Sequence, residues 1–259
     1  MAETQSEGPE VYQGRKTVVT LPTYNESENI GRLVAELRSM GLDVLVADDD
    51  SPDGTHEIVG RLAADDPGVH LLLRKGKRGR GLAGAEAFAS ALAMNAERIV
   101  EMDADLSHRP ADLPRLLRAL DDGADVAVGS RFVHGGRDER PSKTRKALTR
   151  VSTAYARWIL KVPVRDCNSG FRAFTAYAME LVDPRSLISV GPSIVHEVLL
   201  KAHRRGLSIV EVPIEFAERA RGKSALSFKK LLDGFFSVLK FRRLAAKGRL
   251  WVRDVETRS

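Results

Sequence analysis

Two aspartates one residue apart, Asp103 and Asp105, are the residues of this sequence best suited to chemistry. They follow the mostly apolar run Ile99–Met102, which is typical of a buried strand, and Pro110 closes the segment. Carboxylates at the carboxyl end of such a strand lie where open α/β sheets bind ligands. Mg²⁺ takes oxygen ligands and usually combines one or two carboxylates with substrate phosphates. The spacing therefore indicates a metal–diphosphate site; the competing interpretation is a polar turn in which Asp103 caps a helix.

A second acidic cluster, Asp48–Asp50, follows the apolar segment 42–47. Three adjacent carboxylates repel one another, so they must be solvated, hydrogen-bonded or close to a cation. We expect Asp48 and Asp49 to read the base or ribose of a nucleotide, with a capped helix start as the alternative.

Tyr24 follows the first predicted strand and offers a ring for stacking on a base; the alternative is a half-buried aromatic at a strand end.

Strands and helices alternate along the first half of the chain. The apolar patterns predict strands near 17–21, 42–47, 69–73, 98–102 and 124–129, and helices near 28–39, 55–64, 82–94 and 111–120. Such alternation predicts an α/β fold built on a mostly parallel, Rossmann-like sheet with helices on both faces. Both acidic clusters then stand at the carboxyl ends of strands.

The second half of the chain is less regular. The stretch 134–146 is rich in glycine and charge, and we expect a mobile loop beside the site. Helices are predicted near 146–160 and 194–205, and a strand over 207–214 that breaks at Pro213. The first of these helices places several apolar residues on one face, namely Leu148, Val151, Tyr155, Trp158 and Ile159.

The composition sets broad limits on the fold. The chain has 259 residues, enough for one large α/β domain or for a domain with an appendage. Its single cysteine, Cys167, excludes an internal disulfide and a cysteine-based zinc cluster. No apolar stretch approaches the ~18–20 residues that span a bilayer, and no secretory segment is recognisable. We expect a disordered tail over 1–15, a main domain over 16–223 and a basic helix and tail over 224–259.

Positive charge is concentrated near the C-terminus. The formal net charge is +6, and the segment Arg219–Arg253 holds eleven Lys and Arg against one acid, Asp233. This balance implies an anionic partner such as nucleic acid, phospholipid or a phosphorylated substrate. Within the segment apolar residues recur at helical spacing, namely Phe228, Leu231, Leu232, Phe235, Phe236 and Leu239. The pattern fits a basic amphipathic helix on an anionic membrane surface and, equally, a helix packed on the domain.

Six motifs occur in an order that resembles a known enzyme family. They are Pro22–Glu26, Asp48–Thr55, Asp103–His108, Gly129–Arg131, Ser169–Arg172 and Arg219–Ser224. Together they resemble the family-2 inverting glycosyltransferases of GT-A fold and, within them, the catalytic subunits of dolichol-phosphate (polyprenol-phosphate) mannosyltransferases. The resemblance covers about Thr17–Leu239, nearly all of the folded chain. It implies that 16–223 is a GT-A catalytic domain.

The resemblance also implies a reaction and a set of residue roles. The reaction is transfer of mannose from GDP-mannose to a polyprenyl or dolichyl monophosphate, with inversion and with Mg²⁺ or Mn²⁺ as cofactor. The positions that match the family's donor site are Pro22, Tyr24, Glu26, Asp49, Arg80, Asp103, Arg219 and Lys223. Asp103, Asp105 and Ser107 match the metal site, and Arg131, Arg145 and Ser169 match the acceptor-phosphate site. Asp105 and Arg131 are implied to be catalytic.

Two positions depart from the family pattern. Some relatives carry Gln where Ser107 stands, so a water molecule is an alternative third metal ligand. Relatives often end the last motif in Ser-Lys, whereas Ala225 follows Ser224 here, and we expect Lys223 to replace that charge. The acceptor phosphate is already ionised near neutral pH, so no general base is nominated.

The resemblance implies a peripheral protein at the cytoplasmic face of a membrane, held there by the C-terminal helix or by a separate membrane-spanning subunit. Two alternatives remain: a polyprenyl-phosphate glucosyltransferase that uses UDP-glucose, and a non-catalytic nucleotide-sugar-binding subunit. A processive polysaccharide synthase is disfavoured because Ala154 replaces the Gln of a Gln-x-x-Arg-Trp motif before Arg157. A nucleic-acid binder is disfavoured because the basic tail carries no recognised motif and the acidic clusters would repel phosphate.

Overall fold

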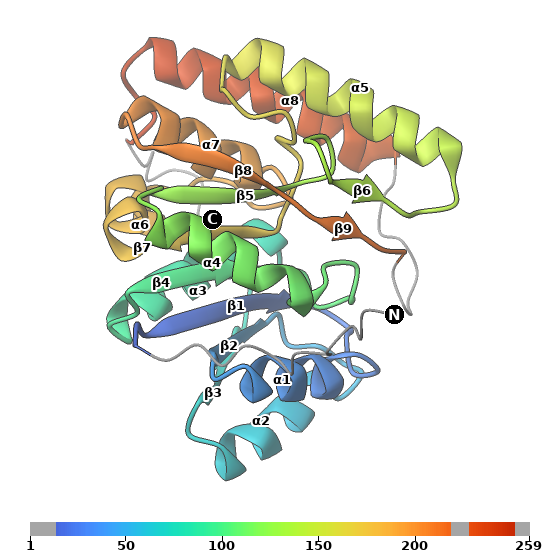
Figure 1. The fold of residues 1–259 in the computed structure, drawn as a ribbon, viewed down its shortest axis with the longest axis vertical. Coiled ribbons are helices and arrows are strands. Elements are labelled where there is room, and N and C mark those ends of the chain that lie inside the picture. The colour runs from blue at the N-terminus through green and yellow to red at the C-terminus, as the bar shows by residue number, and fades with distance from the viewer. Residues whose placement is uncertain (1–13, 219–227, 252–259) are drawn as a thin grey trace, which may run out of the picture.

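A seven-stranded sheet forms the centre of the molecule (Figure 1). The structure is a computed structural model and describes residues 14–218 and 228–251. The strand order is β3-β2-β1-β4-β7-β5-β8. The bounds are β1 Thr17–Thr23, β2 Asp43–Asp48, β3 Val69–Leu73, β4 Arg98–Glu101, β5 Val126–Ser130, β7 Arg172–Thr175 and β8 Ile209–Pro213. Every neighbouring pair is parallel except the two that involve β7, which runs antiparallel to β4 and β5.

Helices cover both faces of this sheet. One face packs against α1 Ile30–Ser39, α2 Thr55–Asp65 and α4 Leu113–Asp121. The other packs against α3 Arg80–Ala93, α6 Ala176–Val182 and α7 Ile194–Arg204. Strand β1 shows why two layers form: Val18 points into one hydrophobic core, while Val19 and Leu21 point into the other. The predicted α/β sheet with helices on both faces is therefore confirmed.

Helix α1 illustrates how the sequence pattern produces a packed element. Ile30, Leu33, Val34 and Leu37 recur at intervals of three and four residues, and all four side chains are buried. Burying a side chain of this size contributes about 1.5–3 kcal/mol. The opposite face carries Arg32, which is exposed, and Glu36, which is half-buried. Single-turn 3₁₀ helices at Pro110–Asp112 and Pro184–Ser186 complete the connections.

Two short strands shape the loop that follows β5. Strand β6 Arg137–Asp138 pairs in parallel with β9 Glu215–Phe216, outside the main sheet. The stretch expected to be a mobile loop thus contains an ordered strand, and helix α5 Lys143–Leu160 begins inside it. Pairing with β9, which lies far along the sequence, supplies the backbone hydrogen bonds that the local pattern did not predict.

Helices α5 and α8 Phe228–Ala246 lie side by side above the sheet (Figure 1). The rings of Tyr155 and Phe235 stack with centroids 4.1 Å apart, and Val238 and Phe241 of α8 join the main core. Trp158 and Val151 of α5 nevertheless remain 76% and 68% exposed. None of the helices within the described ranges combines the length and hydropathy that a membrane span requires.

Candidate functional site

The carboxyl ends of β1, β2, β4 and β5 meet at one edge of the sheet. Tyr24, Asp49 and Arg131 directly follow β1, β2 and β5, and Asp103 lies two residues beyond the end of β4. Because β7 is antiparallel, its first residue, Arg172, and the preceding Phe171 stand at this same edge. Four of the six sequence motifs meet there through parallel strands, and a fifth through β7.

Asp48 organises the loop after β2 from within the protein. Its side chain is fully buried, and its carboxylate accepts hydrogen bonds from the Thr23 hydroxyl at 2.8 Å and the Ser51 hydroxyl at 2.7 Å. The Ser51 N–H donates to it as well, at 2.8 Å. These bonds satisfy a buried charge that would otherwise be costly. Asp48 therefore fastens the ends of β1 and β2 together, and we assign it no ligand contact.

Asp49, by contrast, reaches across to the start of helix α3. Its carboxylate accepts a hydrogen bond from the Gly79 N–H at 2.7 Å and forms an ion pair with Arg74. The side chain is almost fully buried. Asp49 thus joins the loop after β2 to the glycine- and arginine-rich loop 74–81, at the end of the edge where we predict the nucleotide to bind.

Tyr24 stands at the same end of the edge and is 45% exposed. The Arg78 guanidinium lies 4.9 Å from the centre of its ring and donates to its hydroxyl at 2.9 Å. Pro22 is the penultimate residue of β1, and the Glu26 side chain accepts from the Asn29 amide at 2.9 Å. The structure therefore brings Pro22, Tyr24, Glu26 and Asp49 to neighbouring loops, with an aromatic face accessible for stacking.

Arg80 bridges Glu101, the last residue of β4, and Asp103, two residues further on. Its Nη1 lies 3.1 Å from Glu101 Oε1, and its Nη2 lies 2.7 Å from Asp103 Oδ1. Burial opposes the charge on Arg80, but attraction by Asp103 and Glu101 outweighs it and raises the pKa of the guanidinium. Burial raises the pKa of Glu101, although Arg80 and Arg172 act in the opposite direction. Sequence reasoning placed Arg80 beside the donor but missed Glu101, which it read as part of an apolar strand.

Asp105 lies in a tight turn beside Asp103. Its Oδ1 accepts from the Ser107 N–H at 3.0 Å and from the Ser107 hydroxyl at 2.5 Å, and both side chains are buried. The intervening Leu106 has φ of +62°, a conformation that costs a branched side chain energy and marks a constrained turn. Asp105 and Ser107 are therefore in direct contact within the turn that also carries Asp103, and a shared role of the three as metal ligands remains a prediction.

The His108 side chain forms a hydrogen bond with the backbone of this turn. Its Nδ1 accepts a hydrogen bond from the Asp103 N–H at 3.1 Å, which places the ring proton on Nε2. The ring stacks on Phe171 with centroids 5.1 Å apart. Burial lowers the pKa of His108, despite the opposing influence of Asp103 and Asp105. The neutral imidazole of His108 thus fixes the backbone of Asp103. The position of His108 in the motif does not by itself predict this hydrogen bond.

The donor atoms in this cluster suit a hard divalent cation. Asp103 and Asp105 supply carboxylate oxygens and Ser107 a hydroxyl, the ligand types that Mg²⁺ and Mn²⁺ take. The described residues contain no group of three or more His, Cys, Asp or Glu side chains arranged to enclose a metal. A cation here would need oxygens from a substrate phosphate to complete its shell, which matches the usual behaviour of Mg²⁺.

The turn before β7 lies in contact with Arg80 and Asp103. A Cβ atom at Gly170 would lie 2.7 Å from Arg80 Nη2 and 3.6 Å from Asp103 Oδ1, so the backbone there touches the Arg80–Asp103 pair. The adjacent Ser169 is buried, and its hydroxyl accepts from the Phe171 N–H at 3.3 Å. The Ser169–Gly170 turn therefore links the acidic cluster to the arginine described next.

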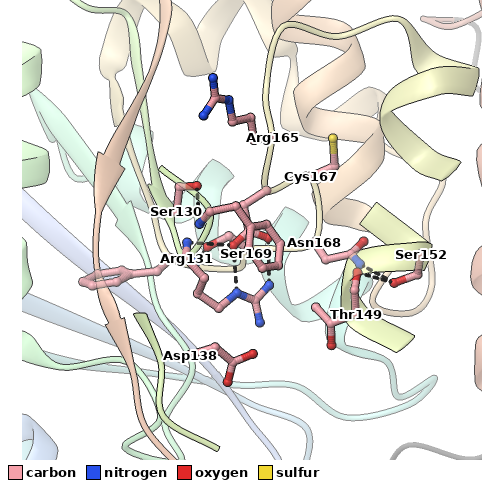
Figure 2. A network of polar contacts seen from close by, with 12 residues as sticks. Ser130, Arg131, Asp138, Thr149, Ser152, Arg165, Cys167, Asn168 and Ser169 are labelled. Carbon is pink, nitrogen blue, oxygen red and sulfur yellow. Dashed lines mark hydrogen bonds and ion pairs between the residues drawn. The ribbon is translucent and has the colours of Figure 1, made fainter. Parts of the chain in front are cut away.

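Arg131 is held in a two-pronged ion pair with Asp166 (Figure 2). Its Nε and Nη2 each lie 2.7 Å from a carboxylate oxygen, and its N–H donates to the same carboxylate at 3.0 Å. Burial disfavours the charge, but Asp166 outweighs burial and raises the pKa of Arg131. The guanidinium also lies 4.9 Å from the centre of the Phe216 ring. Sequence reasoning selected Arg131 but missed Asp166.

Arg145 lies apart from this buried pair, exposed in the first turn of α5. Within the described residues no acidic side chain pairs with it. Nearby, Arg140 binds Asp138 through two hydrogen bonds and donates to the Thr149 hydroxyl at 3.1 Å. Figure 2 shows Thr149 and Asp138 flanking the Arg131 guanidinium. The predicted donor residues Arg219 and Lys223 lie outside the described residues.

A buried acid on α7, Glu197, positions the loop that contacts the start of α3. The Glu197 carboxylate accepts from the backbone N–H groups of Ile188 and Ser189, each at 2.9 Å. This fixes the loop 188–191, whose Val190 carbonyl accepts from the Gly81 N–H at 2.9 Å at the start of α3. Glu197 was not predicted, because a charged residue in an amphipathic helix is normally exposed.

A second network connects α7 to α5. His196 Nε2 lies 2.8 Å from the Asn168 side-chain oxygen, and the Asn168 amide donates to the Ser152 hydroxyl at 2.7 Å (Figure 2). Burial, assisted by Arg172, lowers the pKa of His196 to about 3. Arg172 itself is fully buried and donates to the carbonyl of Cys167 at 3.1 Å. The loop 166–170 is thus fixed from both sides.

The sequence matches a known family of enzymes. The family model described as "Glycosyl transferase family 2" matches residues 18–180. The chain is 38% identical to the polyprenol monophosphomannose synthase of Mycolicibacterium smegmatis over 91% of this chain and 89% of that protein. It is 39% identical to the undecaprenyl-phosphate mannosyltransferase of Micrococcus luteus over 82% of this chain and 88% of that protein.

The fold also resembles a solved structure, glucosyl-3-phosphoglycerate synthase from Mycobacterium tuberculosis in complex with Mn²⁺, UDP-glucose and phosphoglyceric acid. The TM-score is 0.67 at 21% sequence identity, and the match covers 88% of this chain and 80% of the other. At this identity the likeness concerns the fold, and it agrees with the sheet and the helical layers described above.

Proposed function

The chain belongs to glycosyl transferase family 2 and is a glycosyltransferase, and we propose that it moves mannose from GDP-mannose to a polyprenyl monophosphate. The products would be polyprenyl-phosphate-β-mannose and GDP. The observation that carries this proposal is that relatives named for mannose transfer to a polyprenyl phosphate match 91% and 82% of this chain. The substrate roles of individual residues below are part of the proposal.

The donor would lie along the edge from β2 to β4. Tyr24 would stack on the guanine base, with Pro22, Glu26 and Asp49 around the nucleoside. Asp103 and Asp105, with Ser107, would hold Mg²⁺ or Mn²⁺; when bound, the cation would neutralise charge that develops on the departing diphosphate. Arg80 would add a second positive charge there, since it already lies 2.7 Å from Asp103.

The acceptor phosphate would lie on the β5 side of the acidic cluster. Arg131 and Arg145 suit this role because a guanidinium meets phosphate oxygens in pairs, and Asp166 holds Arg131 in place. Ser169 would add a hydroxyl. A phosphate oxygen attacks the anomeric carbon in line, the bond to the donor diphosphate breaks, and GDP leaves with the electron pair. No general base is required, because the acceptor is already an anion near neutral pH.

The lipid acceptor requires contact with a membrane, and α5 and α8 offer a surface for it. Trp158, Val151 and Phe236 are 76%, 68% and 62% exposed on these two adjacent helices. Exposed apolar residues beside basic ones are typical of helices that lie in a membrane interface. We therefore extend the expected membrane contact from the C-terminal helix to a joint surface of α5 and α8.

Donor choice tests the proposal. Purified protein would be given GDP-mannose or UDP-glucose, each labelled in the sugar, together with a polyprenyl monophosphate and Mg²⁺. We expect label to enter the organic-extractable lipid from GDP-mannose, in a product with a β-linked mannosyl phosphate. Label from UDP-glucose alone would keep the family and overturn the sugar. If the protein binds either donor but transfers no sugar to the lipid in any preparation, a non-catalytic subunit would be favoured.

A further inference from the structure

A basic groove lies beside helix α5 and adjoins the site described above. Its volume is about 440 Å³, and Arg150, Arg157 and Arg165 are its principal charged residues. Arg150 and Arg157 stand two helical turns apart on α5, about 10.5 Å along its axis. Arg131 lines the groove as well, but it is the arginine that we place at the acceptor phosphate. The groove is therefore open to an anion through three other guanidinium groups.

These three arginines have no acidic partner within the described ranges. All three are exposed, and no carboxylate there lies within ion-pair distance of their side chains. Glu211 is close, but its carboxylate accepts the backbone N–H groups of Arg165 and Asp166, at 2.8 and 3.0 Å. Figure 2 shows the Arg165 side chain directed away from the guanidinium of Arg131. Three like charges around one groove repel one another until an anion enters.

The groove borders the exposed apolar surface of the same helix. Val151 and Trp158 each follow one of the groove arginines, Arg150 and Arg157, in the sequence, so they lie one step around the helix. If α5 rests on a bilayer through Trp158 and Val151, the arginines come to the depth of the lipid headgroups. Guanidinium groups bind phosphate oxygens in pairs, which suits a phosphodiester headgroup.

We propose that the groove formed by Arg150, Arg157 and Arg165 binds the phosphate headgroup of an anionic membrane phospholipid. This site adjoins the acceptor-phosphate site, which we place at Arg131, Arg145 and Ser169, and Arg131 lies at the border between the two. It would anchor the enzyme at its working surface and would set its preference for anionic membranes. The inference rests on the proposed function, in that a lipid acceptor brings the enzyme to a membrane.

The test compares two double variants of equal charge. R150Q/R157Q removes two groove charges, whereas R32Q/R61Q removes two exposed charges from α1 and α2, at the opposite end of the molecule (Figure 1). Binding of each protein to vesicles of phosphatidylcholine, with or without phosphatidylglycerol, would be measured by flotation. Transfer to a short-chain, water-soluble prenyl phosphate would be measured in the absence of vesicles.

We expect R150Q/R157Q to bind phosphatidylglycerol vesicles about 30-fold more weakly, because each basic residue at an anionic surface contributes about 1 kcal/mol. R32Q/R61Q should lose less than about threefold, and transfer to the soluble acceptor should persist in both. Equal losses in the two variants would overturn the inference, since they would indicate general charge attraction. Loss of soluble transfer in R150Q/R157Q alone would also overturn it, by placing the groove in the acceptor site. Absence of transfer by the unmodified protein would instead refute the proposed function.

Discussion

Arg131 and Asp166 are joined by two hydrogen bonds of 2.7 Å in the interior of the protein, between the end of β5 and the loop before β7. The carboxylate is fully buried and the guanidinium nearly so. Asp166 also accepts the N–H of Arg131 at 3.0 Å. The pair therefore fixes both the backbone and the side chain of the arginine that we place at the acceptor phosphate.

This pair predicts a large loss of stability in D166N. Removing one partner of a buried ion pair leaves the other charge without compensation, which costs about 3–5 kcal/mol. The matched control is D66N, since the Arg38–Asp66 pair is partly exposed and such pairs contribute at most about 1 kcal/mol. Urea unfolding of the three proteins measures the difference. Similar small losses in both variants would mean that Arg131 does not depend on Asp166.

Two glycines offer a test of the loop that faces the donor. A Cβ atom at Gly81 would lie 2.4 Å from the Ser189 carbonyl oxygen and 2.7 Å from that of Gly191, so G81A forces the backbone apart. We expect a loss of about 1–3 kcal/mol in urea unfolding and weaker donor binding. At Gly31 the nearest atom would be 3.9 Å away, so G31A should stabilise α1 by up to about 1 kcal/mol. Wild-type stability and donor affinity in G81A would refute the close contact.

His196 predicts a specific acid sensitivity. Its folded pKa of about 3 lies below the ordinary value of 6.5, so between these values the unfolded chain binds more protons. The stability that neutral His196 supports is complete above pH 6.5 and falls as the pH drops towards 3. Between pH 7 and pH 5 the wild type should lose about 2 kcal/mol more than H196Q, as measured by urea unfolding at each pH. Parallel losses in the two proteins would show that His196 titrates normally.

Cys167 should be inert in the folded protein. Its side chain is buried, and burial raises the pKa of the thiol to about 12, so little thiolate forms at neutral pH. We expect iodoacetamide to add one label in denaturant and essentially none under native conditions, as read by intact mass. Rapid labelling of the native protein would contradict the packing of the loop 166–170.

The sequence pattern predicted much of the sheet and one side of the site. Apolar runs ending in polar residues located β2 and β4, because buried strands and their ligand-bearing ends have a local signature. Strand β7 was not predicted, because its four residues show no alternation and its neighbours lie far away in the sequence. Its antiparallel insertion is nevertheless what brings Gly170 against Arg80.

The partners of the predicted site residues could not be found in the same way. Arg131 and Asp166 are 35 residues apart in the sequence. The residues around either one give no indication that the two side chains form an ion pair. Glu197 and Lys201 lie in a helix in which both are completely buried, against the ordinary exposure of charged residues. The pairing and burial of these charged side chains depend on tertiary packing, which the local sequence does not encode. The roles assigned here to Arg145, Arg219 and Lys223 remain predictions from the family resemblance.

The most direct measurement is the initial rate of mannose transfer from labelled GDP-mannose to a polyprenyl monophosphate, for the wild type and for D105N. Each protein would be assayed with Mg²⁺ or Mn²⁺ and with EDTA, and D122N, an exposed acid after α4, is the matched control. We predict metal-dependent label in the lipid for the wild type and D122N, and a loss of at least about a hundredfold in D105N, the scale of one lost charge-stabilising group. Full transfer by D105N, or by the wild type in EDTA, would contradict the metal role. No transfer under any condition, with GDP-mannose still bound, would contradict the account as a whole.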